Sequence, residues 1–121
     1  LDDTIILQLD MSLMGRLVQN LVENAIKYGK PDGQIWIKLE QKGNEVLFHV
    51  QDDGIGIAKE EQEKIWKRFY QVDASRTGKR GAGLGLSMVQ KIAELHHGYM
   101  ELESTLGKGS TFTLHLPASQ K

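Results

Sequence analysis

A polar stripe near the start of the chain has residue types and a spacing that could hold a ligand. Asn20, Asn24 and Lys27 follow one another at spacings of four and three residues. In a helix, which turns about 100° per residue, they share one face. Asparagine is a poor residue for a helix interior because its amide competes for backbone hydrogen bonds. The stripe is therefore either a solvated helix side or a set of amide ligands beside an amine.

Two glycine-rich segments come later in the chain. Residues 52–57 (Asp-Asp-Gly-Ile-Gly-Ile) combine a carboxylate with glycines that let backbone pass close to a bound group, although a plain turn has the same pattern. Residues 81–86 (Gly-Ala-Gly-Leu-Gly-Leu) precede a predicted helix, whose first N–H groups favour phosphate. This second segment lacks the Lys-Ser/Thr ending of a P-loop and follows a loop rather than a strand. The P-loop and Rossmann interpretations therefore both fail.

The helices that would position these groups follow from apolar side chains at three- and four-residue intervals. The predicted helices cover residues 11–28, 59–69 and 84–97. Asp10 or Ser12 can cap the first helix, and Gly98 is expected to end the last one. Residues 70–83 are polar and rich in glycine, so we expect a long loop, and a loop of this length usually either carries function or is disordered.

Strands are predicted where apolar and polar residues alternate. They cover residues 5–9, 35–40, 46–51, 99–104 and 111–116. Gly43-Asn44, between the second and third strands, is a hairpin signal. The order of elements predicts an α/β (α+β) two-layer sandwich, with a mixed, mostly antiparallel sheet of about five strands covered on one face by about three helices.

Composition narrows the class of protein. The chain has 121 residues and 13.6 kDa, which suits a single domain over residues 1–121. Lys plus Arg (15) nearly balance Asp plus Glu (16), which argues against binding of nucleic acid and against direct membrane contact. The absence of cysteine fits a cytoplasmic domain. The chain opens at Leu1 without a signal pattern, so it is expected to be a fragment of a longer protein.

In order along the chain, four segments resemble the sequence boxes of the ATP-binding domain of sensor histidine kinases, in the gyrase, heat-shock chaperone, histidine kinase and MutL superfamily. Residues 20–28 are similar to the N box, 52–56 to the first glycine box, 68–70 to the F box and 81–86 to the second glycine box. The resemblance implies the Bergerat fold, a sandwich with a left-handed crossover. ATP would be held between the first long helix and a mobile loop, the ATP lid.

The resemblance also implies roles for individual residues. Asp52 would accept a hydrogen bond from the adenine amino group, for which a carboxylate is suited. Lys27 would reach a phosphate, Tyr28 would pack on the adenine, and Arg68 would approach the γ-phosphate. The expected ATP-binding residues are Asn24, Lys27, Tyr28, Asp52, Gly54, Gly56, Ile57, Phe69, Tyr70, Lys79, Arg80, Gly81, Gly83, Leu84, Gly85 and Leu86.

The resemblance further implies ATP and Mg²⁺ as cofactors, with the metal held by Asn24 helped by Asn20, and amide oxygens suit such a hard cation. Superfamily members that hydrolyse ATP have a glutamate at the position of Asn20 that activates water. An amide cannot take that proton, so hydrolysis should be slow and the γ-phosphate kept for another acceptor. Glu23 is either a substitute base or, more often, a structural helper, and it completes the expected catalytic set with Asn20 and Arg68.

The acceptor that the resemblance implies is a histidine on a helical dimerisation domain of the same kinase. His49 and His115 lie on predicted strands, and His96 and His97 lie at a helix end, so none matches it. The expected function is therefore a protein histidine kinase whose isolated catalytic domain does not phosphorylate itself. A response regulator receiver domain is expected downstream, and the parent protein is expected to be anchored in a membrane.

Two other functions remain open from the sequence. A non-catalytic ATP-binding or sensor module is suggested by the absent acceptor and by Gln71, where the family often has arginine. An ATPase clamp of the gyrase or MutL kind is disfavoured by Asn20, although Glu23 offers a carboxylate that would serve it.

Overall fold

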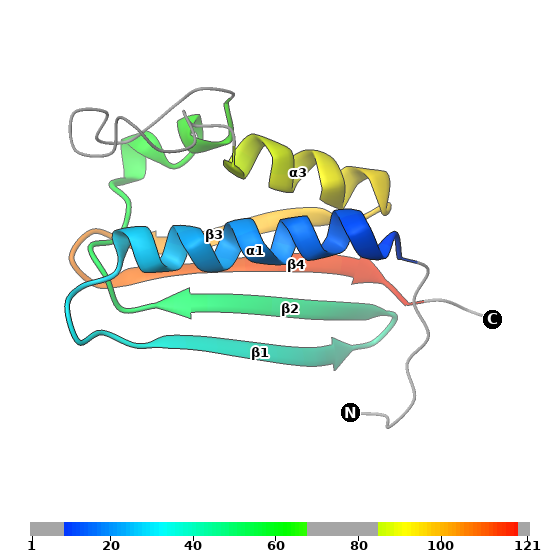
Figure 1. Cartoon of the computed structure of the whole chain (residues 1–121), viewed down its shortest axis with the longest axis horizontal. Coiled ribbons are helices and arrows are strands. Elements are labelled where there is room, and N and C mark those ends of the chain that lie inside the picture. The colour runs from blue at the N-terminus through cyan, green and yellow to red at the C-terminus, as the bar shows by residue number, and fades with distance from the viewer. Residues whose placement is uncertain (1–8, 68–84, 119–121) are drawn as a thin grey trace.

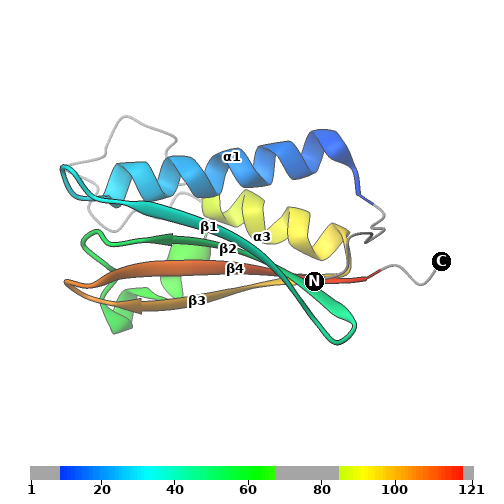
Figure 2. The same cartoon turned by 90° about the horizontal axis from the view of Figure 1, so that it is seen from below.

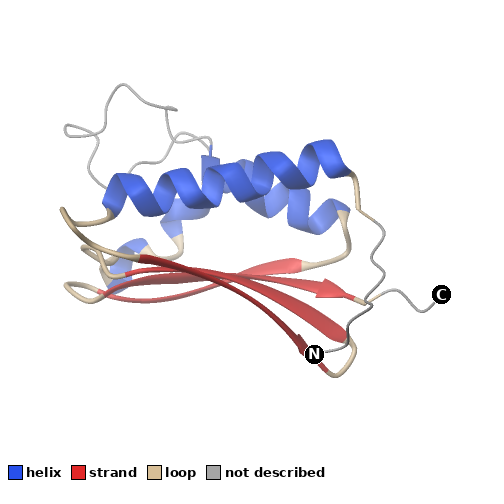
Figure 3. Ribbon diagram, turned by 60° about the horizontal axis from the view of Figure 1, so that its bottom comes forward, coloured by secondary structure: helices blue, strands red, loops and turns tan. Residues whose placement is uncertain are grey.

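The computed structural model describes residues 9–67 and 85–118 of the chain (Figure 1). In order, its elements are the helix α1 (Met11–Tyr28), the strands β1 (Ile35–Lys42) and β2 (Glu45–Asp52), the 3-10 turns η1 (Lys59–Glu61) and η2 (Lys64–Trp66), the helix α3 (Gly85–Leu95), and the strands β3 (Tyr99–Thr105) and β4 (Gly109–Pro117). Both α-helices cover the same face of the sheet, as Figure 3 shows. The predicted two-layer sandwich is confirmed. Neither of the α-helices described here is long and apolar enough to cross a membrane.

The four described strands form one sheet in the order β1-β2-β4-β3, and each neighbouring pair is antiparallel. β1 and β2 form the predicted hairpin, in whose turn Gly43 has a φ of 60° that glycine adopts without steric cost. The sheet has fewer strands than the five or so predicted, because the expected strand at residues 5–9 lies almost entirely outside the described residues. That strand, and the mixed character of the sheet, stay predictions.

The core lies between the two helices and the inner face of the sheet. Leu17 and Leu21 on α1 are fully buried, at a spacing that puts them on one helix face. They belong to one apolar cluster with Val50 of β2 and Phe112 of β4, which are cross-strand partners. This packing fixes α1 over the sheet (Figure 2), and with it the polar stripe that α1 carries.

The start of α1 is capped as predicted and is also tied to the end of α3. Asp10 Oδ1 accepts a hydrogen bond from the Leu13 N–H at 3.0 Å. The His96 ring accepts the Asp10 N–H at 2.9 Å through Nε2, and its Nδ1 lies 2.9 Å from the Ile92 carbonyl oxygen. Because a carbonyl only accepts, Nδ1 carries the proton. His96 thus joins two helices that lie side by side in Figures 1 and 2.

The helix predicted over residues 59–69 is wrong. The described part of this segment forms two separate 3-10 turns, η1 and η2, and Lys67 is already extended. Ile65 is buried, and the neighbouring Trp66 meets Phe112 edge to face with ring centroids 5.8 Å apart. Adjacent residues of an α-helix do not share a face. A tight turn is therefore needed to bring both side chains onto the core.

The end of α3 also differs from the prediction. The helix ends at Leu95, and His97 rather than Gly98 takes the left-handed conformation, with a φ of 64°. Histidine tolerates this region better than most residues. The Gly98 N–H closes the turn on the Ala93 carbonyl at 2.9 Å. Glycine is needed at position 98 for space, because an added Cβ would lie 2.1 Å from the His115 carbonyl oxygen.

Candidate functional site

Asp52 stands at the end of β2, where the first glycine-rich segment leaves the sheet. Its side chain is almost fully buried, with 5% of the residue exposed, and its Oδ1 accepts the Gly54 N–H at 2.8 Å. Burial raises the pKa of the Asp52 carboxyl, and the N–H groups of Gly54 and Ser110 only partly oppose that effect. A buried acceptor of this kind suits a ligand that donates hydrogen bonds.

The glycines of this segment are there for close packing. A Cβ on Gly54 would lie 2.1 Å from the Tyr28 carbonyl oxygen, and the Ile55 N–H donates to that same oxygen at 3.1 Å. Gly56 has a φ of 73°, and its Cβ would lie 2.2 Å from the Thr105 carbonyl oxygen. We call residues 52–57 the glycine turn. It is wedged between the C-terminal end of α1 and the connection from β3 to β4.

The structure brings part of the polar stripe of α1 beside the start of α3. Asn20 is half-buried, and its Nδ2 lies 3.7 Å from Met88 Sδ. A Cβ on Gly85, the first residue of α3, would lie 3.8 Å from Asn20 Oδ1. Asn24, one turn further along α1, is half-buried as well. The segments around positions 20 and 85, far apart in the chain, therefore meet in the fold.

Lys27, the last residue of the stripe, and Glu23 beside the stripe lie toward solvent. Lys27 is exposed, with its Nζ 5.5 Å from the centroid of the Tyr28 ring. Glu23 is exposed and accepts a hydrogen bond from Gln19 Nε2 at 3.1 Å. This contact on the outside of α1 fits a structural helper better than a base that activates water.

Several predicted site residues lie outside the described residues, so their roles stay predictions. They are Arg68, Phe69, Tyr70, Lys79, Arg80, Gly81, Gly83 and Leu84. Gly85 and Leu86 are described and form the start of α3, where Leu86 packs against the core cluster. Ile57 is buried at the end of the glycine turn.

One site residue has no counterpart in the sequence prediction. Gly109 opens β4 with a φ of 106°, and a Cβ there would lie 2.1 Å from the Asp52 carbonyl oxygen. Gly109 therefore packs directly against the backbone at the start of the glycine turn. The predicted last strand, in contrast, begins only at residue 111. The available signal is a glycine next to a strand, which often marks close approach of another backbone.

The described residues offer amide groups, and no cluster of carboxylates, as candidate ligands for magnesium. In residues 9–67 and 85–118, no three or more His, Cys, Asp or Glu side chains are arranged to hold a metal ion. The amide oxygens of Asn20 and Asn24 fit Mg²⁺, which typically keeps several waters and takes further ligands from substrate phosphates.

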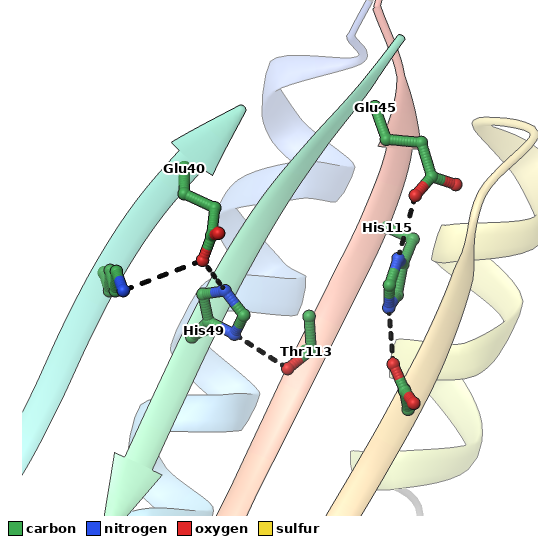
Figure 4. A network of polar contacts seen from close by, with 7 residues as sticks. Glu40, Glu45, His49, Thr113 and His115 are labelled. Atoms are coloured by element: carbon green, nitrogen blue, oxygen red, sulfur yellow. Dashed lines mark hydrogen bonds and ion pairs between the residues drawn. The ribbon is translucent and has the colours of Figure 1, made fainter. Parts of the chain in front are cut away.

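The histidines on the strands are held in polar networks on the face of the sheet away from the helices (Figure 4). His49 Nε2 lies 2.8 Å from Glu40 Oε1, and His49 Nδ1 lies 2.9 Å from Thr113 Oγ1. The hydrogen bond from His49 lowers the pKa of Glu40. This ring bridges three neighbouring strands.

His115 forms the second network, one strand further across the sheet (Figure 4). Its ring nitrogens lie 3.3 Å from Glu45 Oε1 and 2.7 Å from Glu101 Oε1. The ring of Tyr99 stacks on it with centroids 4.3 Å apart. Both histidines therefore have partners within the sheet, and that neither is the phosphoacceptor stays a prediction.

Known proteins are similar to this chain along nearly its whole length. Residues 10–120 match the family of histidine kinase-, DNA gyrase B-, and HSP90-like ATPases. The sensor protein SrrB of Staphylococcus aureus is 43% identical over 109 residues, which make up 89% of this chain and 19% of SrrB. The chain thus spans about a fifth of the length of that relative.

Solved structures show the same fold. The mycobacterial sensor histidine kinase MprB superposes with a TM-score of 0.83 at 27% identity, covering 93% of this chain and 76% of that chain. Full-length ShkA in complex with AMPPNP gives a TM-score of 0.83 at 26% identity, covering 98% of this chain and 24% of that chain. The chain therefore belongs to the histidine kinase-, DNA gyrase B-, and HSP90-like ATPases, an ATP-binding family, and its relatives include sensor histidine kinases.

Proposed function

We propose that this chain binds Mg-ATP and transfers the γ-phosphate to a histidine on the helical dimerisation domain of the same kinase, in two-component signal transduction. The observation that supports this most is the buried Asp52 carboxylate at the start of the glycine turn, a turn that packs on the C-terminal end of α1 through Ile55. An acceptor for the adenine amino group thus stands beside the helix that carries amide and amine groups for the phosphates.

Recognition of adenine follows from the chemistry of Asp52. A carboxylate accepts hydrogen bonds only, and the exocyclic amino group of adenine donates them. Guanine has an oxygen at the corresponding position, which the carboxylate would repel. Tyr28 would contribute its ring, and its backbone carbonyl accepts the Ile55 N–H of the glycine turn.

The phosphates would be held by the polar stripe and the start of α3. The amide oxygens of Asn20 and Asn24 would hold Mg²⁺, which neutralises phosphate charge when bound. Lys27 is exposed, so its ammonium can turn from the Tyr28 ring to a phosphate. Asn20 lies beside Gly85, where the N-terminal end of a helix favours an anion.

The site favours transfer to a protein acceptor over hydrolysis. Asn20 cannot take a proton from water, and Glu23 is exposed and bonded to Gln19. Catalysis would then rest on positioning and on neutralisation of charge. Arg68 and the expected lid would complete the site around the γ-phosphate.

Phosphoryl transfer can be tested by adding the helical domain in trans. The 121-residue chain is incubated with that domain, Mg²⁺ and ATP labelled at the γ-phosphate. We expect label on the added domain, stable in base and lost in acid, and none when its histidine is replaced by glutamine. Nucleotide binding without transfer would instead favour a sensor module. Steady phosphate release by the chain alone would favour an ATPase clamp. A receiver domain of a response regulator is the expected partner downstream.

A further inference from the structure

Ile57, the last residue of the glycine turn, has both of its backbone polar groups held by side chains from outside the turn. Its N–H donates to Ser104 Oγ at 2.8 Å, and its carbonyl accepts from Gln62 Nε2 at 2.8 Å. Gln62 Nε2 also lies 3.1 Å from the Ser104 carbonyl oxygen. Ser104 is on β3, 47 residues along the chain from Ile57. The turn is therefore tied to a distant strand and not only to its own neighbours.

The Ser104 hydroxyl is used to its full capacity. Its Oγ lies 2.9 Å from the Gly109 carbonyl oxygen and 2.8 Å from Ser110 Oγ. A carbonyl oxygen only accepts hydrogen bonds, so the Ser104 hydroxyl donates its single proton to the Gly109 carbonyl. The two remaining lone pairs of Ser104 Oγ then accept the Ile57 N–H and the Ser110 hydroxyl. One hydroxyl thus joins the glycine turn to the opening of β4.

We propose that Ser104 and Gln62 are positioning residues for adenine recognition. By holding Ile57, they fix the far end of the glycine turn, while β2 fixes its near end at Asp52. The Asp52 carboxylate is thereby held in one place relative to the backbone of residues 54–56. This inference rests on the proposed function, since it assigns the two residues to the adenine end of that site.

A purely structural role would have a different signature from a positioning role. If the hydrogen bonds from Ser104 and Gln62 to Ile57 only support the fold, their removal lowers the melting temperature, but the folded molecules still bind adenine nucleotides in preference to guanine nucleotides. If they position Asp52, their removal also lowers the preference for adenine over guanine in molecules that remain folded. The ratio of the two dissociation constants therefore separates these roles.

The test compares two changes that each remove one hydroxyl from the sheet. Ser104→Ala removes the acceptor of the Ile57 N–H. Thr113→Val is the matched control, because it also removes one hydroxyl from the sheet, but on the face away from the helices, where Thr113 Oγ1 contacts His49 and not the glycine turn. Calorimetric titration of the 121-residue chain with Mg-AMPPNP and Mg-GMPPNP gives both constants, and thermal unfolding is recorded in parallel.

We expect Ser104→Ala to raise the dissociation constant for Mg-AMPPNP by about two- to tenfold, the range for one hydrogen bond. The ratio of the dissociation constants for Mg-GMPPNP and Mg-AMPPNP should become smaller. Thr113→Val should change neither dissociation constant appreciably. Ser104→Thr keeps the hydroxyl and should restore the adenine preference. Gln62→Glu, which removes the donor to the Ile57 carbonyl, should act like Ser104→Ala and provides the test if the alanine variant does not fold.

Each contrary result has its own meaning. An unchanged nucleotide ratio in both Ser104→Ala and Gln62→Glu, with wild-type affinity for Mg-AMPPNP, would overturn the positioning role and leave the proposed function standing. Equal effects of Ser104→Ala and Thr113→Val would also overturn it, because the loss would then come from the sheet as a whole and not from the contact with Ile57. If the wild-type chain binds neither nucleotide, the proposed function fails, and this inference fails with it.

Discussion

Replacement of Asp52 by asparagine is the sharpest single test of the adenine site, because it keeps the size of the side chain and removes its charge. The wild-type carboxylate already receives the Gly54 N–H at 2.8 Å, and the N–H of Ser110 also acts on it. A carboxylate has about four lone-pair positions on two oxygens, whereas an amide has about two on one oxygen. In the variant, the backbone groups occupy that oxygen. The adenine amino group then meets an NH₂ group that also donates.

The size of the effect follows from the burial of the site. Asp52 is 5% exposed, so little water is at hand to satisfy the displaced adenine donor. A buried donor without a partner costs about 1–3 kcal/mol. This corresponds to an increase of about five- to 150-fold in the dissociation constant for Mg-AMPPNP. Calorimetric titration of both proteins measures it directly.

The neighbouring residue supplies the control. Asp53→Asn makes the same chemical change one position along, where Oδ1 accepts the Gln34 N–H at 3.0 Å in an exposed setting. Its affinity for Mg-AMPPNP should stay close to that of the wild type. If Asp52→Asn binds within about twofold of a wild type that does bind, Asp52 is not the adenine acceptor. If both variants lose affinity equally, the effect is one of overall charge.

Three further results are expected. Leu17→Ala should lower the free energy of unfolding in urea by about 2–5 kcal/mol, because Leu17 is fully buried, and a loss below about 1 kcal/mol would contradict its place in the core. Gly56→Ala should lower the melting temperature more than Gly43→Ala, because both have a positive φ but only the Cβ at position 56 would meet Thr105, at 2.2 Å; equal shifts would refute the close packing of the glycine turn. Burial raises the pKa of Asp52 above its ordinary 3.8, so the wild type should gain stability relative to Asp52→Asn as the pH falls through the folded-state pKa, with no further gain below 3.8. A difference in unfolding free energy that does not vary with pH would contradict the burial of the carboxylate.

The elements that could be predicted from the sequence are those whose signals are local. α1 has an unbroken apolar stripe and an Asp10 cap, and its bounds agree with the prediction. The hairpin of β1 and β2 combines alternation with Gly43 in its turn. In both cases, residues a few positions apart carry the information, so a period or a cap is enough to place the element.

The features that could not be predicted depend on contacts between distant parts of the chain. The segment that contains Ile65 and Trp66 forms short 3-10 turns instead of the predicted helix, because both side chains pack toward the sheet. The need for glycine at position 109 comes from its contact with the backbone of Asp52, which no local pattern in the sequence indicates. The hydrogen bond between the Ile57 N–H and Ser104 Oγ corresponds to no local sequence pattern, because the two residues are 47 positions apart in the chain. Propensity and periodicity carry no information about such pairs.

The state of Asp52 also links folding to the proposed binding of nucleotide. Its pKa is raised because burial outweighs the N–H groups that Gly54 and Ser110 offer, so the free protein holds a carboxylate that is short of donors. An adenine amino group would supply a further donor and stabilise the ionised form. Binding and ionisation at Asp52 must then favour each other, because linkage between two equilibria is reciprocal. The burial of an ionisable carboxyl at the end of β2, which is unfavourable in the free domain, would thus be offset by the adenine nucleotide that it is proposed to bind.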